Sequence, residues 1–566
     1  MKNRSKIAAI LILLSILVVT VSSIATANPD SKTSPDLNQA TQISTDVQKM
    51  QITVGPGKLI SAKNIQALPA LPAVGKKVKE KDIPIRYAIS KDKMDKLKKQ
   101  PFKAIGKQPK VDEDKSVGNV LNKQPTLISG FEGMDNQLNI LNNGFIVRPP
   151  DPDTAAGPNH IGTVTNSNIR FSTKAGASVL TSSIGSWFSN VYTVCPSCLI
   201  SDPKIEYDPV DGHWVIAVLG IDFTGPTVTG VYLVSASQTS DPTGNWFNYN
   251  LDGNVFIDGV PTWPDYPDIG LDYNSGGASG AIYLSSNNFD STAFNFHTSR
   301  LNILPKAPIY QGQGFSYWYF YGFTDITGER SFTLRPVKTL STVQSVANTP
   351  VEYVVNTRFA NGNFVNLWKI TPAFPPTLPG AVGFAIPIGS YAPPPNAAQP
   401  CDFTLDTIDN RLYQAVFRNG HVYTGFSDAF NFGSGTVSAV RFVDINTNTI
   451  AASQDVRYGA DGVYSWFPAI TTDTNNNIVF VFARSSPSIF AGIRYTGKKT
   501  TDANTEPSAL LKAGQECITG FRWGDYFGVG NDPTNINRVW IYGEYAKNDG
   551  ISSDWDWGTF AGQVSH

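Results

Sequence analysis

Residues 522–546, RWGDYFGVGNDPTNINRVWIYGEYA, hold two alternating apolar runs on either side of a break rich in Asn and Pro. Alternation of this kind, interrupted by turn residues, predicts two strands joined by a turn. The same order recurs six times upstream. The copies are DTAAGPNHIGTVTNSNIRFSTKAG (153–176, the weakest), DPKIEYDPVDGHWVIAVLG (202–220), YPDIGLDYNSGGASGAIYLSSNNF (266–289), SFTLRPVKTLSTVQSVANTPVEYVVNTRF (331–359), DFTLDTIDNRLYQAVFRNGHVYTGF (402–426) and WFPAITTDTNNNIVFVFARSS (466–486).

The repeat predicts an all-β fold, a seven-bladed β-propeller. Units that recur every 50 to 70 residues and hold three or four short strands are typical of propellers. Each small sheet is apolar on both faces, and packing in a ring buries both. Because the first copy is faint, six or eight blades also fit. The final run GTFAGQVSH (558–566) is expected to be an edge strand that pairs with the first unit and closes the ring.

The N-terminus predicts export. A basic start, MKNRSK, precedes the apolar run IAAILILLSILVV and an Ala-Thr-Ala site at 25–27, so residues 1–27 read as a secretory signal peptide. An uncleaved membrane anchor is the alternative. No second stretch approaches the length of a membrane span, which predicts a secreted or cell-surface protein with no transmembrane span after signal cleavage. The net charge of -1 argues against a protein that coats nucleic acid.

Residues 28–130 differ in composition from the propeller domain predicted at 131–566. They are rich in Lys and Pro and poor in aromatics, and residues 76–123 hold fifteen Lys and Arg against seven Asp and Glu. So little apolar surface predicts a mostly disordered linker or propeptide. Its basic charge also fits a tether to an anionic cell envelope. One short helix is expected over 89–100.

The chain has four cysteines, at positions 195, 198, 401 and 517. An even number in an exported protein favours disulfides. A local Cys195–Cys198 bridge would leave Cys401 to pair with Cys517, although three connectivities are open. Redox and zinc roles for the CxxC are weaker alternatives, since no second CxxC follows.

Several of these segments together resemble a known family. They are PPDPDTAAGPNH (149–160), SDPKIEYDPVDGHWVIAV (201–218), SQTSDPTGNWFNY (237–249), RLYQAVFRNG (411–420), WFPAITTDTNNNIVF (466–480), RSSPSIFAGIRYTGK (484–498) and RWGDYFGVGNDPTNINRVWIYGEY (522–545). In their order along the chain and in their amino-acid sequence, they resemble secreted bacterial and archaeal repeat proteins with a sialidase-like β-propeller of the BNR or Asp-box type. Most members have no assigned activity, so the resemblance implies fold and export and assigns no function.

The predicted site is the mouth of the central channel, where the innermost strands begin. Polar and aromatic residues at these starts are Asp153, Asp202, Asp265, Asp402, Trp466, Trp523 and Asp525, with Arg335 inside the fourth unit's first strand. Carboxylates that bind hydroxyls and aromatic rings that stack on a pyranose would suit a sugar. The alternatives are structural: an Asp that caps backbone amides, and a Trp that only packs between blades.

These residues favour a binding module that recognises a glycan or an extracellular protein at the channel mouth, with no residue assigned a catalytic role. A polysaccharide-active glycoside hydrolase or lyase that uses the channel carboxylates is the first alternative, because hydrolysis needs two carboxylates at a set separation. A structural coat protein is the second. No cofactor or metal is expected, although Asp151 and Asp153 together could help to hold calcium.

Overall fold

The computed structural model describes residues 34–35, 37–44, 47–64, 79–102, 106–116, 124–194, 198–273, 280–340, 351–548 and 556–566. All of them belong to one compact unit, Thr33–His566. The signal peptide predicted at 1–27 lies outside the described residues. Within these ranges, no helix is both long and apolar enough to serve as a membrane span.

Most of the described strands of this unit pair as seven groups of four antiparallel strands, and two of these groups, β17–β20 and β28–β31, are joined into one larger sheet. The first four are β8–β11 (Asp153–Ala156, His160–Thr165, Asn168–Thr173, Ser178–Ser183), β12–β15 (Cys198–Asp208, His213–Asp222, Thr229–Ser237, Asn245–Asp252), β17–β20 (Val260–Leu271, Ala281–Asp290, Phe296–Pro305, Phe315–Tyr321) and β21 with β23–β25 (Arg335–Pro336, Glu352–Asn356, Gly362–Thr371, Gly380–Tyr391). The last three are β28–β31 (Leu412–Arg418, His421–Asn431, Thr436–Asn446, Ala451–Gly459), β32–β35 (Tyr464–Thr472, Ile478–Ser486, Ile489–Lys498, Ala509–Lys512) and β36–β38 with β6 (Gly528–Asn531, Arg538–Ala546, Trp557–Ser565, Thr126–Asp135).

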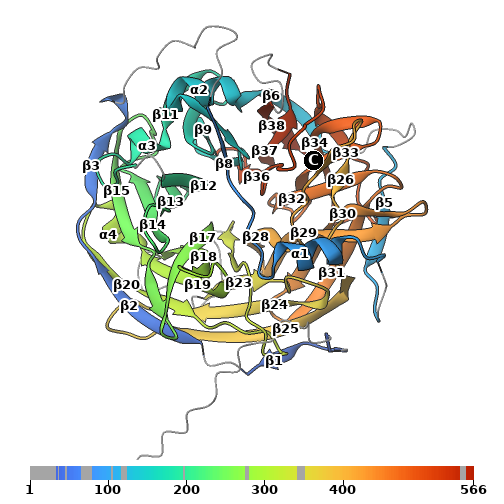
Figure 1. The fold of residues 1–566 in the computed structure, drawn as a ribbon, viewed down its shortest axis with the longest axis horizontal. Helices are drawn as coiled ribbons and strands as arrows, with labels where there is room; N and C mark the ends of the chain where they lie inside the picture. Colours follow the sequence, from blue (N-terminus) through green and yellow to red (C-terminus); the bar gives the residue numbers. More distant parts are fainter. Residues whose placement is uncertain are drawn as a thin grey trace, which may run out of the picture. The chain divides into compact units, whose positions relative to one another are not determined.

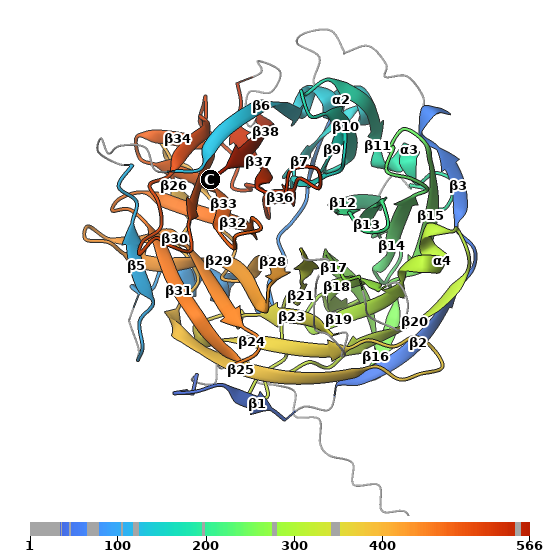
Figure 2. The same ribbon diagram turned by 180° about the vertical axis from the view of Figure 1, so that it is seen from behind.

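The sheets lie around a common centre, and the first strand of each is the innermost (Figure 1; Figure 2 from behind). Short elements between the sheets are α2 (Asn136–Asn143), β7 (Phe145–Arg148), α3 (Ile184–Trp187), β16 (Val255–Ile257), β26 (Ala397–Ala398) and β27 (Thr404–Leu405). Within single sheets, α4 (Lys306–Tyr310) lies between β19 and β20, and β22 (Lys338–Thr339) lies between β21 and β23. The arrangement is nearly all β and propeller-like, in agreement with the predicted fold class.

Each sheet is buried on both faces, which explains the continuous apolar runs in the sequence. In β13, Val215 and Leu219 pack with the β17–β20 sheet, whereas Ile216 and Val218 point the other way, into a cluster with the β8–β11 sheet. Alternate side chains of one strand therefore serve two inter-sheet cores.

A β-bulge recurs in three of the innermost strands. Asp202, Tyr266 and Phe467 have φ of 55°, 56° and 56°, each directly precedes a proline, and the strand register shifts at each point. Left-handed backbone costs a non-glycine residue about 1–2 kcal/mol. Side chains of neighbouring segments meet the bulged amides: Asn166 Oδ1 accepts from Asp202 N at 2.9 Å, and Asp202 Oδ2 accepts from Tyr266 N at 3.2 Å. These bonds link one sheet to the next near the centre.

The stretch at 522–546 forms the start of the last sheet, which packs against the first. The glycines of β36 allow this approach, because a Cβ on Gly528 would lie 2.6 Å from Thr154 N and one on Gly530 would lie 2.9 Å from Ala156 N. The final run does not pair with the first unit as predicted. It forms β38, which pairs with β37 on one side and with β6 on the other.

Much of the segment predicted as disordered is ordered in the described residues. β1 (Thr41–Ile43), β2 (Gln48–Val54) and β3 (Lys58–Ser61) pair with the outer strands β25, β20 and β15, and β5 (Lys110–Glu113) pairs with β31. η1 (Ala62–Asn64), β4 (Lys79–Asp82) and α1 (Lys91–Lys98) lie between them, and α1 agrees with the helix expected over 89–100. For these residues the prediction was wrong, because an existing sheet edge supplies the hydrogen bonds that their composition alone could not. β6 also places residues 126–130 inside the last sheet, across the predicted boundary at 131.

Two further predictions have definite outcomes. Cys401 and Cys517 form a disulfide. Cys195 lies outside the described residues, so the Cys195–Cys198 bridge stays a prediction. The fifth repeat was aligned one strand too early: its innermost strand is β28, and its hairpin turns at Asn419-Gly420.

Candidate functional site

The innermost strands run in the same direction, so their starts gather at one end of the ring and their ends at the other. The strand ends surround a cavity of about 520 Å³. We call this the open mouth. Residues from all seven sheets or the segments that directly follow their first strands line it, including Ala156, Tyr207, Leu271, Thr339, Arg418, Thr471 and Gly530.

An ion pair between Glu206 and Lys338 forms part of the wall of the open mouth. Burial raises the pKa of Glu206 to about 8, although Lys338 opposes the shift. Burial acts against the charged form of Lys338 as well, but Glu206 and Asp153 outweigh it and leave the pKa of Lys338 raised. The pair is therefore a carboxyl group with a raised pKa beside an ammonium group at the edge of the cavity.

A second charged layer lies behind this pair, on the same face of β12. Lys204 is almost fully buried, and burial lowers its pKa to about 8. Its Nζ lies 4.0 Å from Asp268 Oδ1, and Asp268 Oδ2 lies 3.1 Å from Arg335 Nη1. Asp153 Oδ2 accepts from Ile205 N at 3.2 Å, which holds this carboxylate close to the layer.

Arg418 is the cation of the open mouth that has no carboxylate partner among the described residues. Its Nε donates to Thr472 Oγ1 at 3.1 Å, which orients the guanidinium at the cavity wall. Burial lowers the pKa of Arg418. The negative charge of Asp473 acts to raise this pKa, but Asp473 lies too far away to form an ion pair. Asp473 is instead occupied by the backbone amides of Asn475 and Asn477. A buried guanidinium without a counterion favours an anionic ligand.

The opposite end of the ring, where the innermost strands begin, holds a cluster of carboxylates. Asp151 Oδ1 accepts from Asp525 N at 2.7 Å, and Arg522 Nη2 lies 2.6 Å from Asp525 Oδ1. Burial, followed by the neighbouring charges of Asp265, Asp151 and Asp525, raises the pKa of Asp202 well above its usual range. Burial likewise raises the pKa of Glu544. More carboxyl groups gather here than local cations can neutralise.

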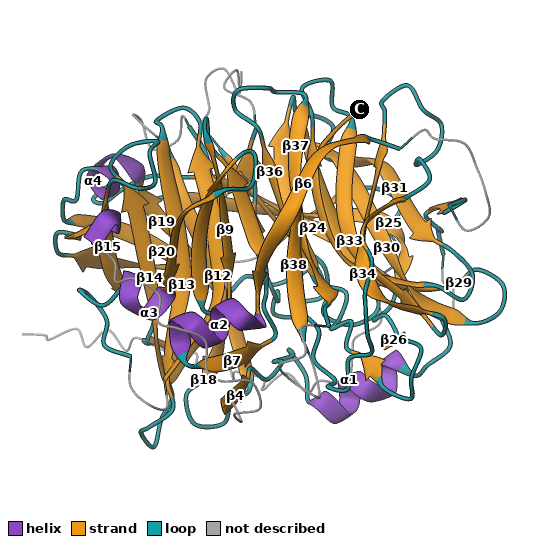
Figure 3. Cartoon of the chain, turned by 90° about the horizontal axis from the view of Figure 1, so that it is seen from above, coloured by secondary structure: helices purple, strands orange, loops and turns teal. Residues whose placement is uncertain are grey.

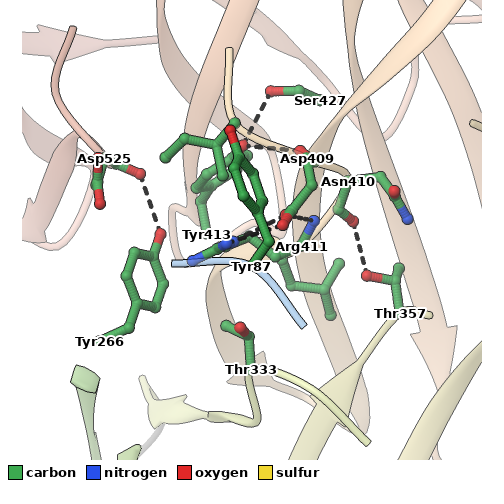
Figure 4. Close-up of polar contacts among 12 residues, drawn as sticks. Tyr87, Tyr266, Thr333, Thr357, Asp409, Asn410, Arg411, Tyr413, Ser427 and Asp525 are labelled. Atoms are coloured by element: carbon green, nitrogen blue, oxygen red, sulfur yellow. Dashed lines mark hydrogen bonds and ion pairs between the residues drawn. The ribbon is translucent and has the colours of Figure 1, made fainter. Parts of the chain in front are cut away.

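Arg411 forms a rigid part of this end (Figure 4). Its Nε and Nη2 each lie 2.8 Å from one oxygen of Asp409, a two-point contact that fixes the plane of the guanidinium. The guanidinium carbon lies 4.4 Å from the ring centroid of Tyr266, and the Tyr266 hydroxyl donates to the backbone oxygen of Asp525 at 3.0 Å. Tyr413 donates to the backbone oxygen of Asp409 at 3.1 Å.

Residues 83–98 cover this end, which we call the covered mouth. In Figure 1 the blue segment crosses the centre of the ring to α1, and Figure 3 shows α1 and β4 at the same end. Lys98 Nζ lies 2.5 Å from Asp406 Oδ1, and the Tyr87 hydroxyl donates to Asp406 Oδ2 at 2.9 Å. Both side chains of the ion pair are almost completely buried, at 3% and 0% exposure.

The structure brings five of the eight predicted site residues to the centre of the ring. Asp202, Asp265 and Asp525 lie together at the covered mouth, and Asp153 and Arg335 belong to the charged layer behind the open mouth. All five make structural contacts.

The other three predicted residues lie elsewhere. Trp466 and Trp523 are fully buried in one hydrophobic core, with ring centroids 6.1 Å apart, so neither can stack on a ligand. Asp402 is exposed and precedes β27. It does not begin an innermost strand, since the innermost strand of that sheet is β28, which begins at Leu412.

Sequence reasoning missed the residues of the open mouth because it took strand starts as the site. Glu206 and Arg418 lie at or near the ends of their strands, and Lys338 follows the end of β21. The signal was available for Glu206 and Arg418, which are charged residues inside or ending apolar strands, DPKIEYD and RLYQAVFR. No group of three or more His, Cys, Asp and Glu side chains in the described ranges is arranged to hold a metal ion. The Asp151–Asp153 calcium site stays a prediction.

No protein-family model matches the chain, and no curated protein matches it. Among solved structures, a GH43 endo-arabinanase from Bacillus licheniformis is similar over 64% of this chain and 93% of its own, at 10% identity and a TM-score of 0.25. The α-L-arabinofuranosidase Arb93A from Fusarium graminearum is similar over 65% of this chain and 93% of its own, at 10% identity and a TM-score of 0.31. A PL25 ulvan lyase covers 71% and 78%, at 8% identity and 0.24. At such low identities and TM-scores these likenesses decide neither the fold nor the function, and the sialidase-like resemblance stays a prediction.

Proposed function

We propose that this protein is an exported, seven-bladed β-propeller that binds an acidic polysaccharide at its open mouth. The observation that carries the proposal is Arg418, a buried guanidinium that faces a cavity of about 520 Å³ with no carboxylate partner among the described residues. The Cys401–Cys517 disulfide fits an oxidising environment outside the cell.

The other groups of the cavity suit a sugar chain. The Glu206–Lys338 pair supplies acceptors and donors for hydroxyls, and Tyr207 and Tyr273 line the same cavity. Lys338 already contacts the Glu206 carboxyl, and Asp532 pairs with Lys174 at 2.7 Å. Arg418 is therefore left to neutralise a carboxylate or sulfate of the ligand.

The test compares retention of residues 28–566 on polygalacturonate with retention on the same polymer after its carboxyl groups are reduced to alcohols. We expect tight retention only on the charged polymer. Arg418→Gln should weaken it by about tenfold or more, because a hydrogen bond to a charged group contributes about 1.5–3 kcal/mol. Arg330→Gln, which removes a cation outside the cavity, is the matched control and should bind like wild type. Equal retention of both polymers, or unchanged binding by Arg418→Gln, would refute the proposal.

Cleavage of the polysaccharide is the second candidate, and one observation favours it. Glu206 has a pKa near 8 and lines the cavity, so its carboxyl can donate a proton at neutral pH. Release of oligosaccharides by wild type but not by Glu206→Gln, with binding retained in the variant, would establish a hydrolase or lyase. Binding without any product would leave the protein a binding module.

A structural coat protein is the least favoured of the three functions. The outer edges of four sheets are covered by β1, β2, β3 and β5. Assembly through sheet edges needs unpaired backbone groups, and these edges offer few.

A further inference from the structure

The segment at the covered mouth is held as a bound peptide would be held. Two arginines of the ring form hydrogen bonds with its backbone: Arg522 Nε donates to Ile83 O at 2.9 Å, and Arg411 Nη2 donates to Arg86 O at 3.1 Å. Two carboxylates of the ring form ion pairs with its cationic side chains: Asp265 with Arg86 and Asp406 with Lys98. Backbone contacts combined with side-chain pockets are the usual basis of peptide recognition.

The first pocket receives Arg86. Its guanidinium carbon lies 4.7 Å from the ring centroid of Trp263, 5.5 Å from Phe294 and 5.9 Å from Phe223, and its Nε lies 3.6 Å from Asp265 Oδ2. Three aromatic rings and one carboxylate around a guanidinium form a cation-selective cage. The Arg86 side chain remains 18% exposed, so the cage opens at the surface.

The second pocket receives Lys98, at the end of α1. Asp406 lies at its base and binds both the ammonium group and the Tyr87 hydroxyl. The segment therefore enters extended, seats Arg86 in the cage, and after one short helix seats Lys98 on the buried carboxylate. This spacing defines the ligand that the covered mouth accepts.

We propose that the covered mouth is a binding site for a basic peptide, and that residues 83–98 are its resident ligand. A partner protein that carries an arginine and, one helical segment later, a lysine would occupy the same two pockets once the resident segment leaves. Polar contacts hold the two cationic side chains, whereas Tyr87 and Met94 of the same segment are buried in a hydrophobic core of the ring. The segment therefore leaves only when both kinds of contact are broken. Because the resident segment is tethered, it outcompetes a free peptide at equal intrinsic affinity. This inference concerns the end of the ring opposite the proposed polysaccharide site.

The test uses the full chain of residues 28–566 with the resident segment loosened by the double substitution Arg86→Ala and Lys98→Ala. The matched control is Lys96→Ala with Lys99→Ala, which removes two exposed charges from the same stretch. Hydrogen exchange of residues 83–98 should speed up by about tenfold or more in the loosened variant only. Circular dichroism checks that the ring is intact, and the single variant Arg86→Ala serves if the double variant does not fold.

A labelled synthetic peptide of residues 79–100 is then added in trans. It should bind the loosened variant, more weakly as salt rises, while wild type and the control bind it at least about tenfold less because the resident segment competes. A peptide with Ala at both cationic positions should not bind. If the segment is released and the peptide still fails to bind, or if the Ala peptide binds equally well, the site is not a peptide-recognition site and the proposal is overturned.

Discussion

Removal of Lys98 should destabilise the folded protein mainly through the charge that it leaves behind. In Lys98→Met the carboxylate of Asp406 stays fully buried without its cation and keeps only the Tyr87 hydroxyl and the Ile408 amide, both at 2.9 Å. Breaking a buried pair on one side costs about 3–5 kcal/mol. The two remaining hydrogen bonds place the expected loss near the lower limit, at about 3 kcal/mol.

The double variant Lys98→Met with Asp406→Asn separates this effect from lost packing. With both charges removed, the site is neutral, and the free energy of unfolding should return to within about 1 kcal/mol of wild type. The single variant Asp406→Asn leaves Lys98 buried without a counterion and should cost a similar amount, so the double-mutant cycle gives a coupling energy of about 5 kcal/mol in size. Lys96→Met, on the exposed side of α1, should change stability by less than about 0.5 kcal/mol.

The effect depends on pH in a defined direction. Burial acts to raise the pKa of Asp406, but Lys98 and the hydrogen bonds outweigh it and hold the pKa below its usual value. The stabilisation is therefore present above the unfolded pKa, about 3.9, and is lost as the pH falls through the lower folded pKa. In Lys98→Met the folded pKa rises, so the loss of stability should be largest at neutral pH and should shrink near pH ~4.

Thermal denaturation followed by circular dichroism measures the cycle. For a chain of 566 residues the entropy of unfolding is about 1.2 kcal/mol per degree, so 3 kcal/mol corresponds to a Tm lower by about 2.5 °C. A coupling energy below about 0.5 kcal/mol, or a loss that is the same at both pH values, would refute the view that a buried ion pair holds residues 83–98 to the ring.

Three further predictions concern stability. Burial and neighbouring carboxylates raise the pKa of Asp202, so wild type loses stability relative to Asp202→Asn as the pH rises above the unfolded pKa. The Tm difference between the two proteins should therefore be larger at pH ~8 than at pH ~5. Equal Tm differences at both pH values would contradict the carboxylate cluster. Replacement of both Cys401 and Cys517 by Ser opens a loop of 116 residues and should lower the unfolding free energy by about 2–5 kcal/mol, measured as a lower Tm than wild type without reductant and an equal Tm with reductant. Deletion of residues 28–64 uncovers the edges of β15, β20 and β25 and should lower the Tm and cause self-association by light scattering; a monomer with unchanged Tm would show that the N-terminal strands are dispensable.

The sequence alone determined the repeat and its consequences. Alternating apolar residues and Asp, Asn and Gly turns are local signals, so the hairpin of 522–546 and its copies could be recognised without knowledge of their neighbours. The same holds for the helix within 89–100. The pairing of Cys401 with Cys517 was one of three open connectivities, and the tertiary structure decided it. The fifth copy was misaligned because Asp402 and Leu412 both begin plausible strands, and only pairing with β29 distinguishes them.

Tertiary structure decided where the N-terminal segment lies and where the chemistry is. Residues 41–61 have no partner in their own sequence neighbourhood, and they become strands only because β25, β20 and β15 offer unpaired edges. Trp466 and Trp523 were predicted as ligand contacts but are buried in one core, Trp466 from β32 and Trp523 from the segment before β36. Arg418 became a candidate only when the ring showed that no described carboxylate reaches it. Local patterns specify strands and turns, whereas the charge balance of a cavity depends on residues hundreds of positions apart.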